Sequence, residues 1–230
     1  MKYLIGDIGN SLTKISILNS KFKILKTYQF ETSKLHAKSY LSRHFKKIKK
    51  TLTNKNFICY EMKQFKINKI IKINVKNFSQ IGSDRLANAI GSYTIHKHNC
   101  LVIDFGTATT FDIVKYPGIY DGGVIAPGIN LSIINLNRFT ASLPIFKLKK
   151  MINKYGRNTK DALNAGFLWG YQGLINNIIK NIIKKSRKDY KIILTGGYAN
   201  HFKRYIYKKS TVDQNITIKG ITQVYKKLVL

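Results

Sequence analysis

The stretch that decides the fold is Leu101–Val114, which reads LVIDFGTATTFDIV. Three apolar residues end near a carboxylate, Asp104, and small or hydroxylated residues follow it in a tight turn. The chain then alternates again, as a returning strand would. Glycine lets a backbone approach a ligand closely, amides and hydroxyls offer hydrogen-bond donors, and a carboxylate can hold a cation. The pattern therefore indicates a strand–turn–strand unit suited to phosphate and metal.

The N-terminus repeats the same order of parts. An apolar run from Tyr3 leads to Asp7, and the small polar turn in DIGNSLTK (Asp7–Lys14) leads into a β-prone segment. Asp7 and Asp104 are roughly 100 residues apart, about the length of one small domain. We interpret the chain as two related halves, each of which presents an acidic hairpin to a shared cleft. The alternative is two ordinary hairpins with glycine turns, which the part-for-part match of the two stretches makes less favoured.

The composition is that of a globular protein. The 230 residues are enough for one large or two small domains, and 44% of them are hydrophobic. The two cysteines, Cys59 and Cys100, have no metal-binding spacing, which favours buried thiols in a reducing cytoplasm. We expect no signal peptide and no segment that spans a membrane.

The net charge of +31, from 41 basic and 10 acidic residues, raises the question of nucleic-acid binding. The lysines are scattered through nearly every segment, and no zinc-finger or RNA-binding aromatic signature accompanies them. We therefore expect no dedicated nucleic-acid function, although a positive cleft would attract ATP and other anions.

Strands and helices alternate along the rest of the chain. Strands are predicted at 2–8, 12–18, 22–30, 56–60, 67–75 and 192–194, and helices at 33–53, 83–96, 130–142, from 161, at 199–209 and from about 222. Ser83 is a candidate cap for the helix of 83–96. Asp84 is either a residue that complements the helix dipole or a base beside an anion clamp, Arg85. Gly122 and Gly123 suggest backbone against a ligand or partner, or a plain connection.

Taken together, these motifs resemble those of type III pantothenate kinases. The motifs that occur in that family's order and approximate spacing are DIGNSLTK (Asp7–Lys14), GSDR (Gly82–Arg85), DFGTATTFD (Asp104–Asp112), GGVIAPG (Gly122–Gly128), GRNT (Gly156–Thr159) and TGG (Thr195–Gly197). The resemblance implies an α/β fold of the acetate and sugar kinase/Hsp70/actin superfamily, with two ribonuclease H-like domains flanking a nucleotide cleft. We place the first domain at residues 1–98 and the second at 99–230.

The function that the resemblance implies is ATP-dependent phosphorylation of pantothenate to 4′-phosphopantothenate, the first step of coenzyme A biosynthesis. It also implies Mg²⁺ with ATP, a monovalent cation (K⁺ or NH₄⁺), and a homodimer whose second subunit walls the pantothenate pocket. Two alternatives stay open. One is a non-catalytic ATP-fold protein that binds partners through its basic surface, and the other is a different sugar-kinase-like enzyme of the superfamily.

The resemblance also assigns roles to residues of this chain. Asp84 would accept the proton of the pantothenate hydroxyl, and Asp104 would bind the monovalent cation. The residues implied to contact pantothenate are Gly82, Ser83, Asp84, Arg85 and Thr159. The residues implied to contact ATP are Asp7, Ile8, Gly9, Asn10, Ser11, Leu12, Thr13, Lys14 and Thr107. One departure is Val75, at a position where the family usually has a tyrosine that contacts pantothenate.

Overall fold

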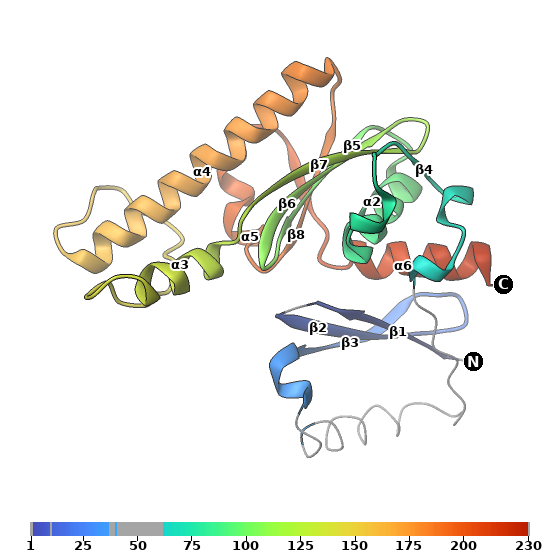
Figure 1. Cartoon of the computed structure of the whole chain (residues 1–230), viewed down its shortest axis with the longest axis horizontal. Helices are drawn as coiled ribbons and strands as arrows, with labels where there is room; N and C mark the ends of the chain where they lie inside the picture. The colour runs from blue at the N-terminus through green and yellow to red at the C-terminus, as the bar shows by residue number, and fades with distance from the viewer. Residues whose placement is uncertain (1, 10, 37–39, 41–61, 230) are drawn as a thin grey trace.

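The computed structural model describes residues 2–9, 11–36, 40 and 62–229, and these residues form two separate sheets (Figure 1). Sheet A is an antiparallel meander of β1 (Tyr3–Ile8), β2 (Leu12–Leu18) and β3 (Ile24–Glu31). Sheet B has the order β4–β7–β6–β5–β8–β9. Its strands are β4 (Lys72–Ile73), β5 (Cys100–Phe105), β6 (Ala108–Lys115), β7 (Ile119–Pro127), β8 (Lys191–Gly196) and β9 (Ser210–Val212).

The decisive stretch lies at the centre of sheet B. β5 pairs antiparallel with β6, from Cys100 opposite Val114 to Phe105 opposite Thr109, and it pairs parallel with β8 on its other side. Successive side chains of a strand point to opposite faces. Leu101 accordingly belongs to the core on one face, and Cys100 belongs to the core on the other. The predicted strand–turn–strand unit is confirmed.

Helices cover both faces of sheet B, as its two apolar cores require. One core is shared with α3 (Ile129–Arg138), α4 (Thr159–Ser186) and α5 (Ala199–Phe202), and the other with α2 (Ser83–His96) and α6 (Ile216–Leu228). Short 3₁₀ turns complete the described chain: η1 (Thr32–His36), η2 (Met62–Gln64), η3 (Ile67–Lys69), η4 (Phe78–Gln80) and η5 (Lys203–Tyr205). No helix among the described residues is long and apolar enough to cross a membrane.

Helix α6 packs against both sheets, and Figure 1 shows it between sheet A and sheet B. Its residue Ile218 packs with Ile5 and Leu18 of sheet A. It also crosses α2 very closely, because a Cβ atom at Gly220 would overlap the carbonyl oxygen of Ala87 and lie 2.6 Å from its carbonyl carbon. The position of sheet A relative to α2 therefore depends on this crossing.

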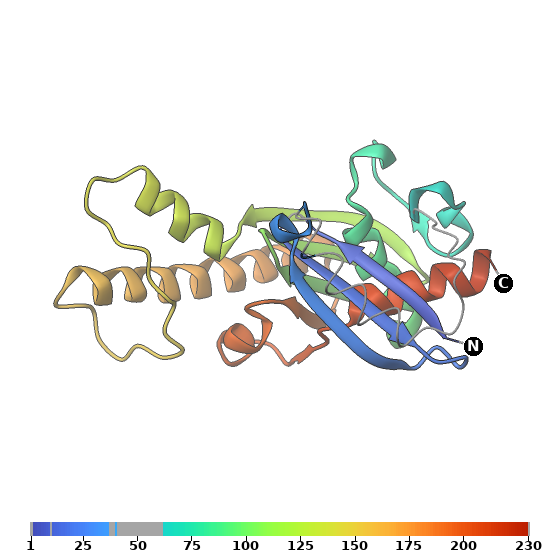
Figure 2. The ribbon, with the colours of Figure 1, turned by 90° about the horizontal axis from the view of Figure 1, so that it is seen from below.

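Helices α3 and α4 form an arm that projects from one end of sheet B (Figure 2). The α4 helix has 28 residues, and only its C-terminal part lies over the sheet. Residues 139–158 connect the two helices of the arm. The arm therefore exposes surface that neither sheet covers.

Several predicted boundaries differ from the observed ones. The last helix begins at Ile216 rather than near Thr222, because tertiary packing of its first turns overrides their modest helix propensity. The helix predicted over 130–142 ends at Arg138. The strand predicted over 67–75 is reduced to η3 and the two residues of β4. The strand predicted at 56–60, with Cys59, and most of the helix predicted at 33–53 lie outside the described residues.

The division into domains at 98/99 stays a prediction. Elements on the N-terminal side of that boundary pack with sheet B: β4 pairs with β7, and α2 contributes Leu86 and Ile90 to one of its cores. The segment that carries GSDR is therefore packed against the same sheet that carries DFGTAT.

Candidate active site

The two acidic hairpins meet at their turns. The hydroxyl oxygens of Ser11, in the β1–β2 turn, and Thr107, in the β5–β6 turn, are 2.7 Å apart, although 96 positions separate the two residues in the chain. Both residues are exposed. The structure thus brings the two predicted phosphate loops together at the junction of the sheets.

Contacts with β3 and η1 stabilise the conformation of the β1–β2 turn. The Thr32 hydroxyl donates a hydrogen bond to the carbonyl oxygen of Gly9 at 2.6 Å and lies 3.0 Å from the hydroxyl oxygen of buried Thr13. Asp7 stands opposite Lys14 in the strand register. Burial raises the pKa of Asp7, the Lys14 ammonium opposes that shift, and Asp84 adds to it. Asp7 is therefore within electrostatic reach of the α2 terminus.

Two apolar side chains that flank this turn are exposed to solvent. The side chain of Ile8 is 78% exposed, and that of Leu12 is also exposed. An exposed apolar side chain beside a polar turn suits contact with a planar or apolar ligand group. The remaining predicted residue of the turn, Asn10, lies outside the described residues.

Asp104 lies at the end of β5 in a setting built from three other segments. Its Oδ2 accepts a hydrogen bond from the Asn88 amide at 3.1 Å. Gly196 has φ +84°, which favours glycine, and a Cβ there would lie only 2.5 Å from Asp104 Oδ1. Burial raises the pKa of Asp104 to about 6; Asn88 and Lys14 lower it, whereas Asp84 and Asp7 raise it further. Three carboxylates therefore repel one another around this point.

The GSDR segment forms the N-terminus of α2. Gly82 is the N-cap residue and Ser83 is the first helical residue, so the prediction that Ser83 caps the helix is wrong. Asp84 is exposed, and its Oδ1 accepts a hydrogen bond from the backbone amide of Arg85 at 2.8 Å. Arg85 turns inward, where its Nε donates to Asp112 at 2.7 Å. The segment thus presents an exposed carboxylate at the N-terminus of α2 beside a guanidinium that is held by Asp112.

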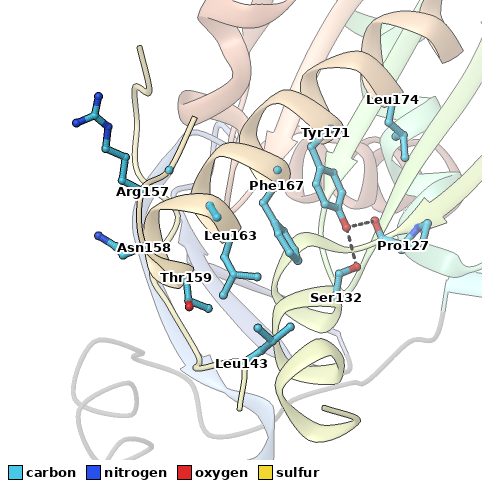
Figure 3. Close-up of a pocket in the computed structure, with 14 residues that line it drawn as sticks. Pro127, Ser132, Leu143, Arg157, Asn158, Thr159, Leu163, Phe167, Tyr171 and Leu174 are labelled. Carbon is cyan, nitrogen blue, oxygen red and sulfur yellow. Dashed lines mark hydrogen bonds between the residues drawn. The ribbon is translucent and has the colours of Figure 1, made fainter. Parts of the chain in front are cut away.

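Thr159, the remaining residue predicted to contact pantothenate, lies on the arm and not beside the two hairpins. It is the first residue of α4 and lines a pocket of about 970 Å³ between α3, α4 and the loop that joins them (Figure 3). The phenolic oxygen of Tyr171 in this pocket is hydrogen-bonded to the Ser132 hydroxyl at 2.7 Å. Asn158 caps α4 by accepting a hydrogen bond from the amide of Asp161. None of the GSDR residues lines this pocket, and Figures 1 and 2 show the N-terminal end of α4 at the tip of the arm, away from α2.

Two residues that sequence reasoning missed hold the site together. Asn88 bridges two segments, because its amide donates to Asp104 while its Oδ1 accepts from the buried Thr217 hydroxyl of α6 at 2.8 Å. The side-chain amide of Gln214 donates to the carbonyl oxygen of Gly196 at 3.0 Å, and its backbone carbonyl accepts from the Lys14 ammonium at 3.4 Å. Asn88 lies one helical turn after Asp84 in α2. Residues spaced i,i+4 share a helix face, and this spacing is the sequence signal that could have placed Asn88 on the same face of α2 as Asp84.

The carboxylates of this site are suited to a bound cation whose other ligands are carbonyl, water or phosphate oxygens. Within the described ranges, no group of three or more His, Cys, Asp or Glu side chains forms a ready metal site. The mutual repulsion of Asp7, Asp84 and Asp104 would be relieved by a cation beside them. Hard cations take carboxylate, carbonyl, water and phosphate oxygens. The arrangement therefore suits cations that arrive with, or next to, a nucleotide.

Comparison with known sequences finds type III pantothenate kinases both by family model and by individual relatives. The family model for type III pantothenate kinase matches residues 49–181. A type III pantothenate kinase of Pelagibacter ubique (strain HTCC1062) is 43% identical over an alignment that covers 95% of this chain and 96% of that protein. A second, of Jannaschia sp. (strain CCS1), is 43% identical over 64% of this chain and 56% of that protein.

Comparison with solved structures identifies the fold. A Campylobacter jejuni protein described as a Baf family transcriptional activator aligns over 98% of both chains with a TM-score of 0.61 and 23% identity. The activator of 2-hydroxyisocaproyl-CoA dehydratase from Clostridium difficile, solved with bound ADPNP, aligns over 98% of this chain and 96% of its own with a TM-score of 0.56 and 11% identity. These likenesses confirm the predicted actin-like ATPase fold.

Proposed function

The chain belongs to the type III pantothenate kinase family, and from that membership we propose how it phosphorylates pantothenate. The reaction uses ATP and yields 4′-phosphopantothenate, the first step of coenzyme A biosynthesis. The observation that carries our assignment of residues is the junction of the Ser11 and Thr107 turns beside three carboxylates. Phosphoryl transfer depends on positioning and charge neutralisation more than on covalent chemistry by the protein.

The two turns hold the phosphates of ATP in this proposal. Asp7–Lys14 and Thr107 supply backbone amides, hydroxyls and the Lys14 ammonium, which are the donors that phosphate oxygens require. The exposed side chains of Ile8 and Leu12 line the same turn. Mg²⁺, when bound with ATP, neutralises phosphate charge as it does in other phosphoryl-transfer enzymes.

Asp104 holds the monovalent cation, K⁺ or NH₄⁺. The support is electrostatic: its carboxylate lies within the influence of Asp7 and Asp84, and Lys14 is the cationic side chain that offsets them. Asn88 keeps one carboxylate oxygen engaged, which leaves Oδ1 directed toward Gly196. With three carboxylates and one positive side chain, Lys14, this site would favour a bound cation.

Asp84 acts as the proton acceptor for the pantothenate hydroxyl. It is exposed on the first turn of α2, and a general base must reach the proton that it removes. Gly82, Ser83 and Arg85 hold pantothenate around it, with the Arg85 guanidinium facing an anionic or carbonyl oxygen. Because water competes with the hydroxyl as phosphoryl acceptor, closure of the two sheets around the substrates would favour the correct transfer.

We further propose that the enzyme is a cytoplasmic homodimer formed through its arm. Apolar side chains that stay exposed along the arm and its loop are Leu131, Ile134, Phe139, Ile145, Met151, Tyr155 and Trp169. Exposed apolar groups that cluster on one surface are typical of protein interfaces. Pairing of two arms would supply Thr159 of the partner subunit to the pantothenate site, which a single chain leaves without it.

A coupled ADP-release assay with ATP, Mg²⁺ and pantothenate tests the assignment. Wild type is compared in K⁺ and Na⁺ with Asp84→Asn, and Asp189→Asn is the matched control because Asp189 is an exposed residue paired with Lys208. We expect K⁺-dependent turnover that Asp84→Asn reduces by about 10²-fold or more and that Asp189→Asn leaves unchanged. Equal activity of both variants would remove Asp84 as the base, and no pantothenate-dependent turnover in wild type would refute the function itself.

A further inference from the structure

The guanidinium of Arg85 is anchored by a carboxylate that the reaction does not use. Arg85 Nε donates to Asp112 Oδ1 at 2.7 Å; the side chain of Asp112 is completely buried, and that of Arg85 is 14% exposed. Burial raises the pKa of Asp112 to about 6, although the Arg85 charge opposes the shift. A buried carboxylate costs free energy unless it is paired and hydrogen-bonded, and the Arg85 guanidinium supplies that pairing here.

Tyr120 fixes the same oxygen of the carboxylate. Its phenolic hydroxyl donates to Asp112 Oδ1 at 2.9 Å, and its ring is buried in the core that α2 shares with sheet B. Burial raises the pKa of Tyr120, so the hydroxyl remains a donor. Among the described residues, Asp112 Oδ2 accepts a hydrogen bond only from the Thr110 hydroxyl, at 3.5 Å. Two strands, β6 and β7, therefore hold Asp112 Oδ1 in a single orientation toward Arg85.

The register of the strands makes room for this arrangement. Gly123 of β7 stands directly opposite Asp112 of β6. A Cβ at Gly123 would overlap the carbonyl oxygen of Phe111 and lie 2.8 Å from Arg85 Nη2. Arg85 Nη2 is itself buried and has no hydrogen-bond partner among the described residues. Asp112 thus engages the Nε side of the guanidinium, and an Nη donor stays unused.

We propose that Asp112 and Tyr120 are positioning residues that hold the Arg85 guanidinium in the orientation in which the exposed part of its side chain faces pantothenate. The proposal rests on the function proposed above, in which Arg85 binds pantothenate. Neither residue touches the substrate: Tyr120 orients Asp112, and Asp112 orients Arg85. Support from packed strands makes a functional side chain more precise than a side chain left free on a helix end.

The test compares the KM for pantothenate, the KM for ATP and kcat across matched variants. Tyr120→Phe removes one hydroxyl and keeps the buried ring, and we expect it to raise the KM for pantothenate about 3- to 10-fold with the KM for ATP within twofold of wild type. Tyr190→Phe is the control, because Tyr190 is also buried and its hydroxyl has no hydrogen-bond partner in the described chain. It should change neither KM.

A double-mutant cycle separates positioning from general destabilisation. We expect Asp112→Asn to raise the KM for pantothenate about 10- to 100-fold in wild type and less than twofold in an Arg85→Ala background, since a residue that acts through Arg85 has no effect without it. If Asp112→Asn does not fold, Tyr120→Phe alone decides. An unchanged KM for pantothenate in Tyr120→Phe, equal changes in both KM values, or additive effects in the cycle would overturn the inference while wild-type turnover upholds the function. Wild type without pantothenate-dependent turnover would overturn both.

Discussion

Replacing Gly220 by alanine should destabilise the protein, although alanine is the better helix former. Gly220 lies inside α6, where alanine would gain about 1 kcal/mol of helix propensity. A Cβ there would overlap the carbonyl oxygen of Ala87 on α2 and lie 2.6 Å and 2.9 Å from its carbonyl carbon and Cα. These are backbone atoms that cannot rotate away, so the two helices must separate. Overpacking of this kind costs about 1–3 kcal/mol or more, which exceeds the propensity gain.

The effect should also reach the site. Because Ile218 of α6 packs on Ile5 and Leu18, a displaced α6 moves sheet A and loosens the contact between Ser11 and Thr107. We expect a net loss of about 2 kcal/mol, a fall in Tm of about 4–8 °C, and a higher KM for ATP. Thermal and urea denaturation measure the first two, and the coupled assay measures the third.

The matched control is the same substitution in α4. A Cβ at Gly173 would have no atom within 4 Å, so Gly173→Ala should stabilise the protein by about 0.5–1 kcal/mol. The two variants therefore test the sign as well as the size of the effect. A Gly220→Ala protein with a Tm equal to or above that of wild type would refute the argument that the α2–α6 crossing is closed to a side chain.

Three further outcomes are expected. Asn88→Ala leaves the buried Thr217 hydroxyl and one Asp104 oxygen without their partner. The free energy of unfolding measured in urea should therefore fall by about 1–3 kcal/mol, and turnover should need a higher K⁺ concentration. Asn181→Ala, on the exposed side of α4, should change neither. The pKa of Asp112 is raised by burial from 3.8 to about 6, so the folded state holds this proton more tightly than the unfolded state. Its contribution to stability is greatest below pH 4 and is lost as pH rises through 6, so between these values the free energy of unfolding of wild type should fall relative to that of Asp112→Asn. Chelation by EDTA should abolish turnover, and excess Mg²⁺ should restore it, as measured by ADP release; turnover that persists in EDTA would contradict a role for Mg²⁺.

Local patterns predicted the parts of the site that are local. An apolar run, a carboxylate and a glycine turn are consecutive in the chain, so the hairpins around Asp7 and Asp104 were predictable from alternation and turn chemistry alone. The helix that begins at GSDR was predictable for the same reason, and it runs over Ser83–His96. Its cap was mispredicted because Ser83 and Gly82 both satisfy the sequence preference for an N-cap residue.

The contacts that assemble the site were not predictable, because each joins residues far apart in the chain. Nothing near Asp112 in sequence indicates that it will meet Arg85, and nothing near Asn88 indicates Thr217. The start of α6 at Ile216 likewise depends on burial against other elements rather than on its own propensity.

The sequence by itself thus determined the two hairpins and the helix that carries Asp84, and it predicted the groups that would contact phosphate. Only the tertiary structure decided that the turns meet through Ser11 and Thr107, that Arg85 is anchored by Asp112, and that Thr159 lies apart on the arm. The physical reason is that alternation and turn preferences act over a few residues. Helix crossings, strand register and burial are instead set by the packing of the whole chain, which only the fold reveals.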